Sequence, residues 1–339
     1  MSGAPGRQDG LEAEIPHILT KGMDIMSTHV KALCLCCVSM TACAFEAMDG
    51  PEQWEGKPSE QGAIATHASP IRDGIVQSSA QHVVRISNDY GTCSGTLIAR
   101  DAILTAAHCF GSLVNLSANS FSVPHVRVSR KTGPSGQWQC ISNWDNTYPK
   151  NTSSANACST DGWTLVDIHP SARIKGGASV RDHDMAIMRP NKSGSGDVWI
   201  TSEIPTWVSL DRDTPLSTEI AYGIGANSRN GSGVGEVRSG IFFASSFTTY
   251  SRYYVLFGTD NYESCAGDSG GPAGYFLSGG TVGITFGVSG VISGGPTAGE
   301  CTKPSELTRV SAKLSWIEDK LNRTCRRFTA SGRRQADCW

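Results

Sequence analysis

Residues 261–272 read NYESCAGDSGGP and place Ser269 between glycines. Glycine adopts backbone angles that other residues avoid, so this segment can form a tight turn that leaves the serine hydroxyl exposed. In such a turn the backbone N–H groups of Gly267 and Ser269 would converge as an oxyanion hole. The alternative is a glycine-rich hairpin loop without chemistry, and this segment by itself leaves that alternative open.

A second segment, residues 92–109, reads TCSGTLIARDAILTAAHC. An apolar run typical of a buried strand leads into two small alanines and then into His108. Small residues let the backbone and the imidazole approach a cleft closely. A histidine beside a cysteine is more often a structural group than a catalyst when it stands alone. Together with the Ser269 segment, however, His108 predicts a serine nucleophile and its general base.

Both segments resemble the hallmarks of the chymotrypsin/trypsin family of serine proteases, Thr-Ala-Ala-His-Cys and Gly-Asp-Ser-Gly-Gly-Pro. The triad of that family runs His, Asp, Ser along the chain. Residues 182–188 (DHDMAIM) supply the acid, since Asp184 matches the family's Asp-Ile-Ala-Leu pattern and Asp182 is two residues out of register. The resemblance therefore implies Ser269 as the nucleophile, His108 as the general base and Asp184 as the residue that orients the histidine.

Short runs of Val, Ile, Thr, Tyr and Phe, separated by Gly, Ser and Asn, favour an all-β fold. The family resemblance covers about residues 71–323 of the 339-residue chain and implies two six-stranded antiparallel β-barrels with the active site between them. Residues 82–86 are the first clear strand. Apolar residues at 314, 317 and 321 predict a C-terminal helix over residues 311–321.

The twelve cysteines form two groups. Four lie in one N-terminal apolar segment, and the remaining eight are Cys93, Cys109, Cys140, Cys158, Cys265, Cys301, Cys325 and Cys338. No CxxC pair occurs among the eight, which argues against a zinc site and for disulfides formed in an oxidising compartment. The resemblance implies the pairs Cys93–Cys109 and Cys265–Cys301, and the others pair most simply as Cys140–Cys158 and Cys325–Cys338. We predict no metal and no cofactor.

Residues 1–43 are interpreted as an N-terminal extension and a signal peptide. From Met26 the chain carries one lysine and then a short apolar run that ends in small residues, which is the layout of a secretory signal. Met40-Thr-Ala-Cys43 resembles a bacterial lipobox, which predicts lipid attachment and membrane anchoring at Cys43. Ordinary signal cleavage nearby is the alternative. The protein is thus expected to be exported, as a cell-envelope lipoprotein or as a secreted protein.

Three further segments follow the signal. Residues 44–70 are polar and acidic and predict a flexible tether or a propeptide. Residues 71–323 are the predicted protease domain, and residues 324–339 form a tail with a disulfide. In the family a freed N-terminal amine pairs with the aspartate before the nucleophile, here Asp268, and either Ile71 or Ile75 could supply that amine.

Specificity is predicted from the position six residues before the nucleophile, which is Glu263. A buried carboxylate there favours a cationic Arg or Lys side chain, although the longer Glu could instead fill the pocket or turn away. The predicted pocket walls are Thr285, Phe286, Gly287 and Ser305, and Ser305 would narrow the base of the pocket.

The expected function is that of a monomeric serine endopeptidase, which acts on protein or peptide substrates and forms an acyl-enzyme on Ser269. The formal net charge of −2 gives no reason to expect a nucleic-acid partner. The alternative is a catalytically silent, protease-like binding protein, but such relatives usually lose the histidine or the serine. An α/β-hydrolase esterase is excluded because it needs a histidine after the serine, and no histidine follows His183.

Overall fold

The structure is a computed structural model that describes residues 71–72, 74–77, 80–115, 120–122, 125–132, 137–141, 151–152, 165–173, 182–189, 207–225, 236–244, 252–258, 262–278, 284–294, 301 and 305–339. All of them belong to one unit of the chain, Glu60–Trp339. The predicted signal peptide, the lipid site at Cys43, the tether over residues 44–70 and Cys158 lie outside the described residues.

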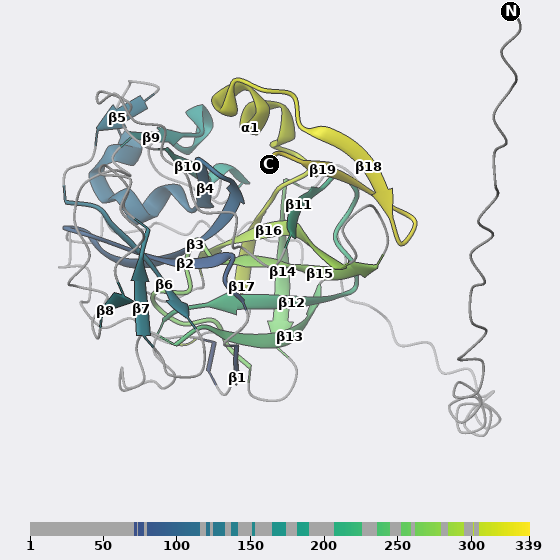
Figure 1. Ribbon diagram of the computed structural model, residues 1–339, viewed down its shortest axis with the longest axis horizontal. Coiled ribbons are helices and arrows are strands. Elements are labelled where there is room, and N and C mark those ends of the chain that lie inside the picture. Colours follow the sequence, from purple (N-terminus) through teal and green to yellow (C-terminus); the bar gives the residue numbers. More distant parts are fainter. Residues whose placement is uncertain are drawn as a thin grey trace, which may run out of the picture. The chain divides into compact units, whose positions relative to one another are not determined.

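Six antiparallel strands close into a barrel in the C-terminal half, drawn in green in Figure 1. They pair in the order β15-β12-β13-β14-β17-β16, and β16 pairs back onto β15. Their bounds are Thr218–Gly223 (β12), Arg238–Ala244 (β13), Tyr253–Gly258 (β14), Pro272–Ser278 (β15), Ile284–Gly294 (β16) and Ser305–Arg309 (β17). Four further strands extend this sheet: Ile75–Val76 (β1), Trp207–Asp211 (β11), Arg326–Ala330 (β18) and Arg333–Asp337 (β19).

A second antiparallel sheet is built from the N-terminal half, drawn in blue and teal. Its strand order is β5-β9-β10-β4-β3-β2-β6-β7-β8. Its members are Val83–Asn88 (β2), Gly91–Ala99 (β3), Ala102–Thr105 (β4), Ser120–Ser122 (β5), Arg127–Thr132 (β6), Gln137–Cys140 (β7), Asn151–Thr152 (β8), Leu165–Ile168 (β9) and Ala186–Arg189 (β10). The mostly-β fold class predicted from the sequence is confirmed, with one closed six-stranded barrel beside this sheet.

Helices are few and short among the described residues. Two 3-10 segments, Ala107–Asn115 (η1) and Pro170–Arg173 (η3), accompany one α-helix, Leu314–Leu321 (α1). The predicted apolar stripe of α1 is buried, since Leu314, Ile317 and Leu321 face the core. No helix in the described part of the chain has the length and apolar character needed to cross a membrane.

One hydrophobic cluster joins the two sheets and the helix. Leu104 of β4, Ile187 of β10, Val288 of β16 and Ile317 of α1 all belong to it and are fully buried. A shared core fixes the position and orientation of the two sheets relative to each other, because a packed interior deforms little. Side chains at the facing edges of the two sheets can therefore form one site.

Candidate active site

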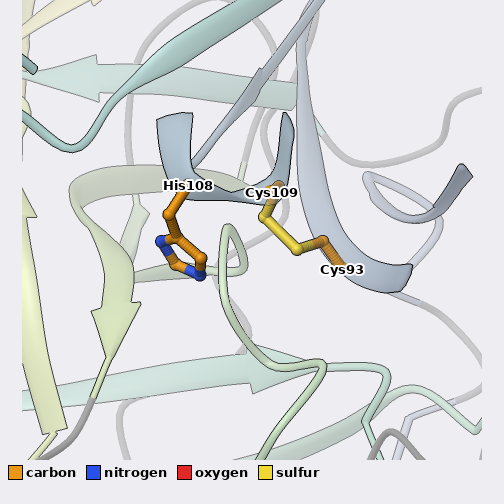
Figure 2. A group of neighbouring side chains, drawn as sticks. All are labelled: Cys93, His108 and Cys109. Carbon is orange, nitrogen blue, oxygen red and sulfur yellow. A yellow bond between two sulfur atoms is a disulfide. The ribbon is translucent and has the colours of Figure 1, made fainter. Parts of the chain in front are cut away.

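His108 lies at the start of η1, directly after the buried strand β4. Ala106 and Ala107 are fully buried. A disulfide between Cys93 and Cys109 ties β3 to η1 next to the histidine, as Figure 2 shows. The backbone that carries His108 is thus held on both sides, by the strand before it and by the disulfide after it.

The cysteines beside His108 also bear on metal binding. Cys93, His108 and Cys109 bring three ligand-type atoms within 4.8 Å of one another (Figure 2). Both sulfurs are joined in a disulfide. Metal ligation by cysteine uses the thiolate, so this group cannot supply a three-ligand site.

Asp184 binds His108 through both carboxylate oxygens. Oδ2 lies 2.6 Å from His108 Nδ1, and Oδ1 accepts a 2.8 Å hydrogen bond from the backbone N–H of His108. Ser293 donates a further hydrogen bond of 2.6 Å to Oδ2. Asp184 is 2% exposed, while the His108 side chain is 40% exposed. The carboxylate is thus buried and satisfied, and the ring it holds faces solvent.

The pair shifts the pKa of each partner. Burial lowers the pKa of His108, but the charge of Asp184 and its hydrogen bond outweigh this effect and raise that pKa above 6.5. Burial raises the pKa of Asp184, but the charge and hydrogen bonds of His108 and the Ser293 hydroxyl bring that pKa below its usual range. Nδ1 of His108 is therefore held as the donor, which leaves Nε2 available as a base.

Ser269 sits in a glycine turn that is packed against the other sheet. Gly270 has a φ of 84°, and a Cβ there would lie 2.1 Å from the Thr105 hydroxyl of β4. The Ser269 carbonyl accepts a 2.8 Å hydrogen bond from the N–H of Ser94 in β3. Only glycine can pack this closely against β4. The close packing places Ser269 beside β3 and β4, the strands that lead to His108.

Among the described residues, Nε2 of His108 and the Ser269 hydroxyl form no hydrogen bond with each other. The N–H groups of Gly267 and Ser269 have no acceptor in the described part of the chain either. In enzymes without substrate such contacts are commonly long and tighten only in the complex. The structure places His108 at the start of η1 and Ser269 in the turn that contacts Ser94 and Cys109.

Asp268, the residue before Ser269, is fully buried. Its oxygens accept hydrogen bonds from the N–H groups of Cys265 (2.8 Å) and Gly225 (3.1 Å). Burial raises the pKa of Asp268 well above its usual range, and the two hydrogen bonds only partly oppose this rise. No basic group forms an ion pair with it among the described residues. Within the described part of the chain, Asp268 is thus a buried acid whose oxygens are bound by backbone N–H groups and by no cationic side chain.

The predicted pocket residues separate into two places. Ser305 lies against Ser264, which was not among the predicted residues, with the two hydroxyl oxygens 2.5 Å apart, and Glu263 pairs with Arg72 at 2.9 Å. Thr285 and Phe286, by contrast, are buried at the start of β16, where Phe286 packs on Tyr222.

The assignment of Thr285, Phe286 and Gly287 to the pocket walls does not agree with this geometry. Ser293, which contacts Asp184, is seven residues beyond Phe286 on β16, or about 23 Å at the rise of an extended strand. The end of β16 at Ser293 and Gly294 therefore flanks the site instead. Both ends of β16 carry small polar residues and glycine, so the sequence alone does not distinguish the end that lies at the site.

Three of the described disulfides match the predicted pairs: Cys93–Cys109, Cys265–Cys301 and Cys325–Cys338. Cys140 is also disulfide-bonded, and its partner lies outside the described residues. Several disulfides fit an exported protein, since such bonds persist in oxidising compartments.

A histidine held by a buried aspartate, next to a serine on a glycine turn between two β-sheets, defines the serine-protease class of site. The family model described as "Trypsin" matches residues 72–317, and the chain belongs to that family.

Three relatives show the extent of the similarity. Melanization protease 1 of Drosophila melanogaster is 25% identical over 245 residues, which cover 68% of this chain and 58% of the relative. Trypsin-1 of Gadus morhua is 24% identical over 269 residues, which cover 77% of this chain and 95% of the relative. Chymotrypsin-like elastase family member 3B of Homo sapiens is 28% identical over 246 residues, which cover 68% of this chain and 79% of the relative.

Two residues of this region were missed from the sequence. Ser293 lies on β16 in the run Val-Ile-Ser-Gly, where a serine inside an apolar strand hinted at a buried partner. Arg72 stands 191 residues from Glu263 and carried no signal for that contact.

Proposed function

We propose that this protein is a serine endopeptidase that hydrolyses peptide bonds through an acyl-enzyme on Ser269. The observation that supports it best is the buried Asp184, bonded to His108 beside the Ser269 turn. In this proposal Ser269 Oγ attacks the scissile carbonyl, and His108 Nε2 takes its proton and passes it to the leaving amine. Water then hydrolyses the ester, with His108 again as the base.

Asp184 would keep the imidazole in the tautomer that leaves Nε2 unprotonated, and would stabilise the imidazolium formed during transfer. The N–H groups of Gly267 and Ser269 would bind the oxyanion. Removal of one such donor typically costs about 10²–10³ in rate. Their lack of an acceptor among the described residues leaves them available for this role.

We further propose that activation frees the amine of Ile71, not that of Ile75. Ile71 is fully buried, and Arg72 N–H donates to the carbonyl of Glu263, close in sequence to Asp268. Ile75 is 60% exposed on β1. An ammonium group brought to Asp268 would offset the cost of ionising a buried carboxyl group.

The remaining expectations stand as proposals. The substrates would be proteins or peptides, and the protein would act as an exported monomer. Lipid on Cys43 would attach it to a membrane if the lipobox is used. The predicted preference for Arg or Lys substrates depended on a carboxylate of Glu263 that is open to substrate, and the pairing of Glu263 with Arg72 weakens that basis.

The test is hydrolysis of a reduced, alkylated protein by the processed, disulfide-bonded enzyme. Ser269→Ala and His108→Ala should each lower the rate by about 10⁴-fold or more. Ser217→Ala, an exposed serine of the same fold, is the matched control and should retain full activity. Equal rates in all four proteins would rule out the proposal. No cleavage by any of them would favour the protease-like binding protein.

A further inference from the structure

Arg72 and Glu263 form a double contact that joins the start of the described domain to the segment leading to Ser269. The backbone N–H of Arg72 donates to the carbonyl of Glu263 at 2.9 Å, and the guanidinium lies 2.9 Å from the carboxylate. The Glu263 side chain is 10% exposed and that of Arg72 is 32% exposed. The carboxylate is thus mostly buried, and its charge is already balanced by a residue of this chain.

This pair lies beside the candidate site. Glu263 and Ser264 immediately precede Cys265, which is bonded to Cys301. Opposite them, Ser305 begins β17, and Gly294 of β16 pairs with its neighbour Glu306. The residue before Gly294, Ser293, holds Asp184. The two segments therefore meet beside the proposed nucleophile.

The two segments touch at their serines. The hydroxyls of Ser264 and Ser305 are 2.5 Å apart, and both residues are buried. This hydrogen bond closes the two segments against each other at that point. A long side chain could reach beyond this point only by breaking the contact and leaving both hydroxyls to find other partners, which costs free energy.

The ion pair between Arg72 and Glu263 also disfavours a cationic substrate side chain. A cationic side chain entering this space would lose its water and meet a carboxylate that already holds a guanidinium. A buried charge without its own partner is strongly unfavourable. A short uncharged side chain meets neither cost.

We propose that Arg72 is a specificity-determining residue: by neutralising Glu263 behind the Ser264–Ser305 contact, it makes this protease cleave after small uncharged residues and not after arginine or lysine. This inference depends on the proposed endopeptidase function. It names the class of substrate side chain on the carbonyl side of the cleaved bond, the P1 side chain.

The experiment compares kcat/KM of the processed wild-type enzyme on peptides that differ only at P1, with Ala, Val, Phe, Glu, Lys or Arg. Ala and Val peptides should be cleaved at least about tenfold faster than Lys and Arg peptides. An equal or higher rate on Lys or Arg would overturn the inference and leave the endopeptidase function intact. Neither cleavage nor labelling of Ser269 by a phosphonate would instead remove the proposed function, and this inference with it.

Variants identify the residues responsible. The double variant Arg72→Gln, Ser305→Gly should raise the Lys-to-Ala ratio of kcat/KM by at least about tenfold, since it frees the carboxylate and opens the base. Arg326→Gln, which breaks an exposed ion pair with Asp337, is the matched control and should keep the wild-type ratio. A folded and active double variant with the wild-type ratio would show that Arg72 does not set specificity.

Discussion

The imidazole of His108 is the group whose surroundings most directly decide whether the site can act. One side faces a buried carboxylate and the other faces solvent. This asymmetry fixes which nitrogen carries the proton. It also raises the pKa of the ring above 6.5, since the charge of Asp184 outweighs the effect of burial.

The pH profile of kcat/KM should follow this shift. The base form of His108 exists above its pKa, so the rate should fall as the pH drops through a value above 6.5. In Asp184→Asn the acid limb should move to lower pH, and the rate should drop by about 10⁴-fold. Measurement from about pH 5 to about pH 9 tests both points. A wild-type midpoint below 6.5 would contradict the account of the pair.

Ser293 is expected to act on the same carboxylate. Ser293→Ala removes a 2.6 Å hydrogen bond to Asp184, so kcat/KM should fall roughly tenfold, as expected for one bond to a charged group. The acid limb should shift as well, which loss of packing alone would not cause. Ser209→Ala is the control, because Ser209 is a buried serine that bonds Gln335 instead. An unchanged pH profile in Ser293→Ala would argue against a positioning role.

At the scale of elements, strand β12 carries a carboxyl group into the closed barrel. Glu219 is 1% exposed and accepts a 2.7 Å hydrogen bond from Tyr254 of β14. Burial raises the pKa of Glu219 to about 7, against the hydrogen bonds that lower it. The barrel therefore contains an acid that is neutral when the folded protein is at mildly acidic pH.

Stability should depend on this proton. The folded state retains it up to about pH 7, whereas the unfolded chain loses it near 4.5, so stability falls as the pH rises between these values. Glu219→Gln should remove that loss and be more stable than wild type above neutral pH, by up to about 3 kcal/mol. Urea unfolding at about pH 5 and about pH 8 measures the difference in the free energy of unfolding between wild type and Glu219→Gln. The same difference between wild type and variant at both values would contradict the assignment.

At the scale of the whole molecule, the C-terminal residues belong to the barrel sheet. The hairpin β18–β19 pairs with β11, and Arg333 forms a 2.8 Å ion pair with the fully buried Asp211. Figure 1 shows the two strands of this hairpin beside β11. The disulfide Cys325–Cys338 closes the base of the hairpin. Residues 324–339, interpreted from the sequence only as a tail with a disulfide, therefore also cover part of the fold.

Loss of that disulfide should destabilise the protein without disabling the site. The double variant Cys325→Ala, Cys338→Ala opens a loop with a sequence separation of 13 residues, worth about 3 kcal/mol in the chain-entropy model. Thermal unfolding should shift to lower temperature, while kcat/KM at room temperature stays at the wild-type value. An equal loss of activity in the folded variant would indicate a role for the hairpin in the site.

The sequence was sufficient for local features and insufficient for distant ones. The segments around His108 and Ser269, the stripe of α1 and three of the four disulfide pairs could be predicted because their signals lie within short runs or in a family pattern. Residues 326–337 are rich in arginine and lack the alternation of a strand, so only pairing with β11 makes them one. The pocket walls and the Arg72–Glu263 contact depend on which ends of distant strands meet, and no local pattern encodes that.

The central claim is that Ser269 is an activated nucleophile. The direct test is the intact mass of the processed, disulfide-bonded protein before and after exposure to an active-serine phosphonate. Ser269→Ala is the control that lacks the nucleophile, and Ser217→Ala is the same substitution at an exposed serine outside the site. We predict a single adduct in the wild type and in Ser217→Ala, and none in Ser269→Ala. No adduct on the wild type, or an adduct that persists in Ser269→Ala, would contradict the account.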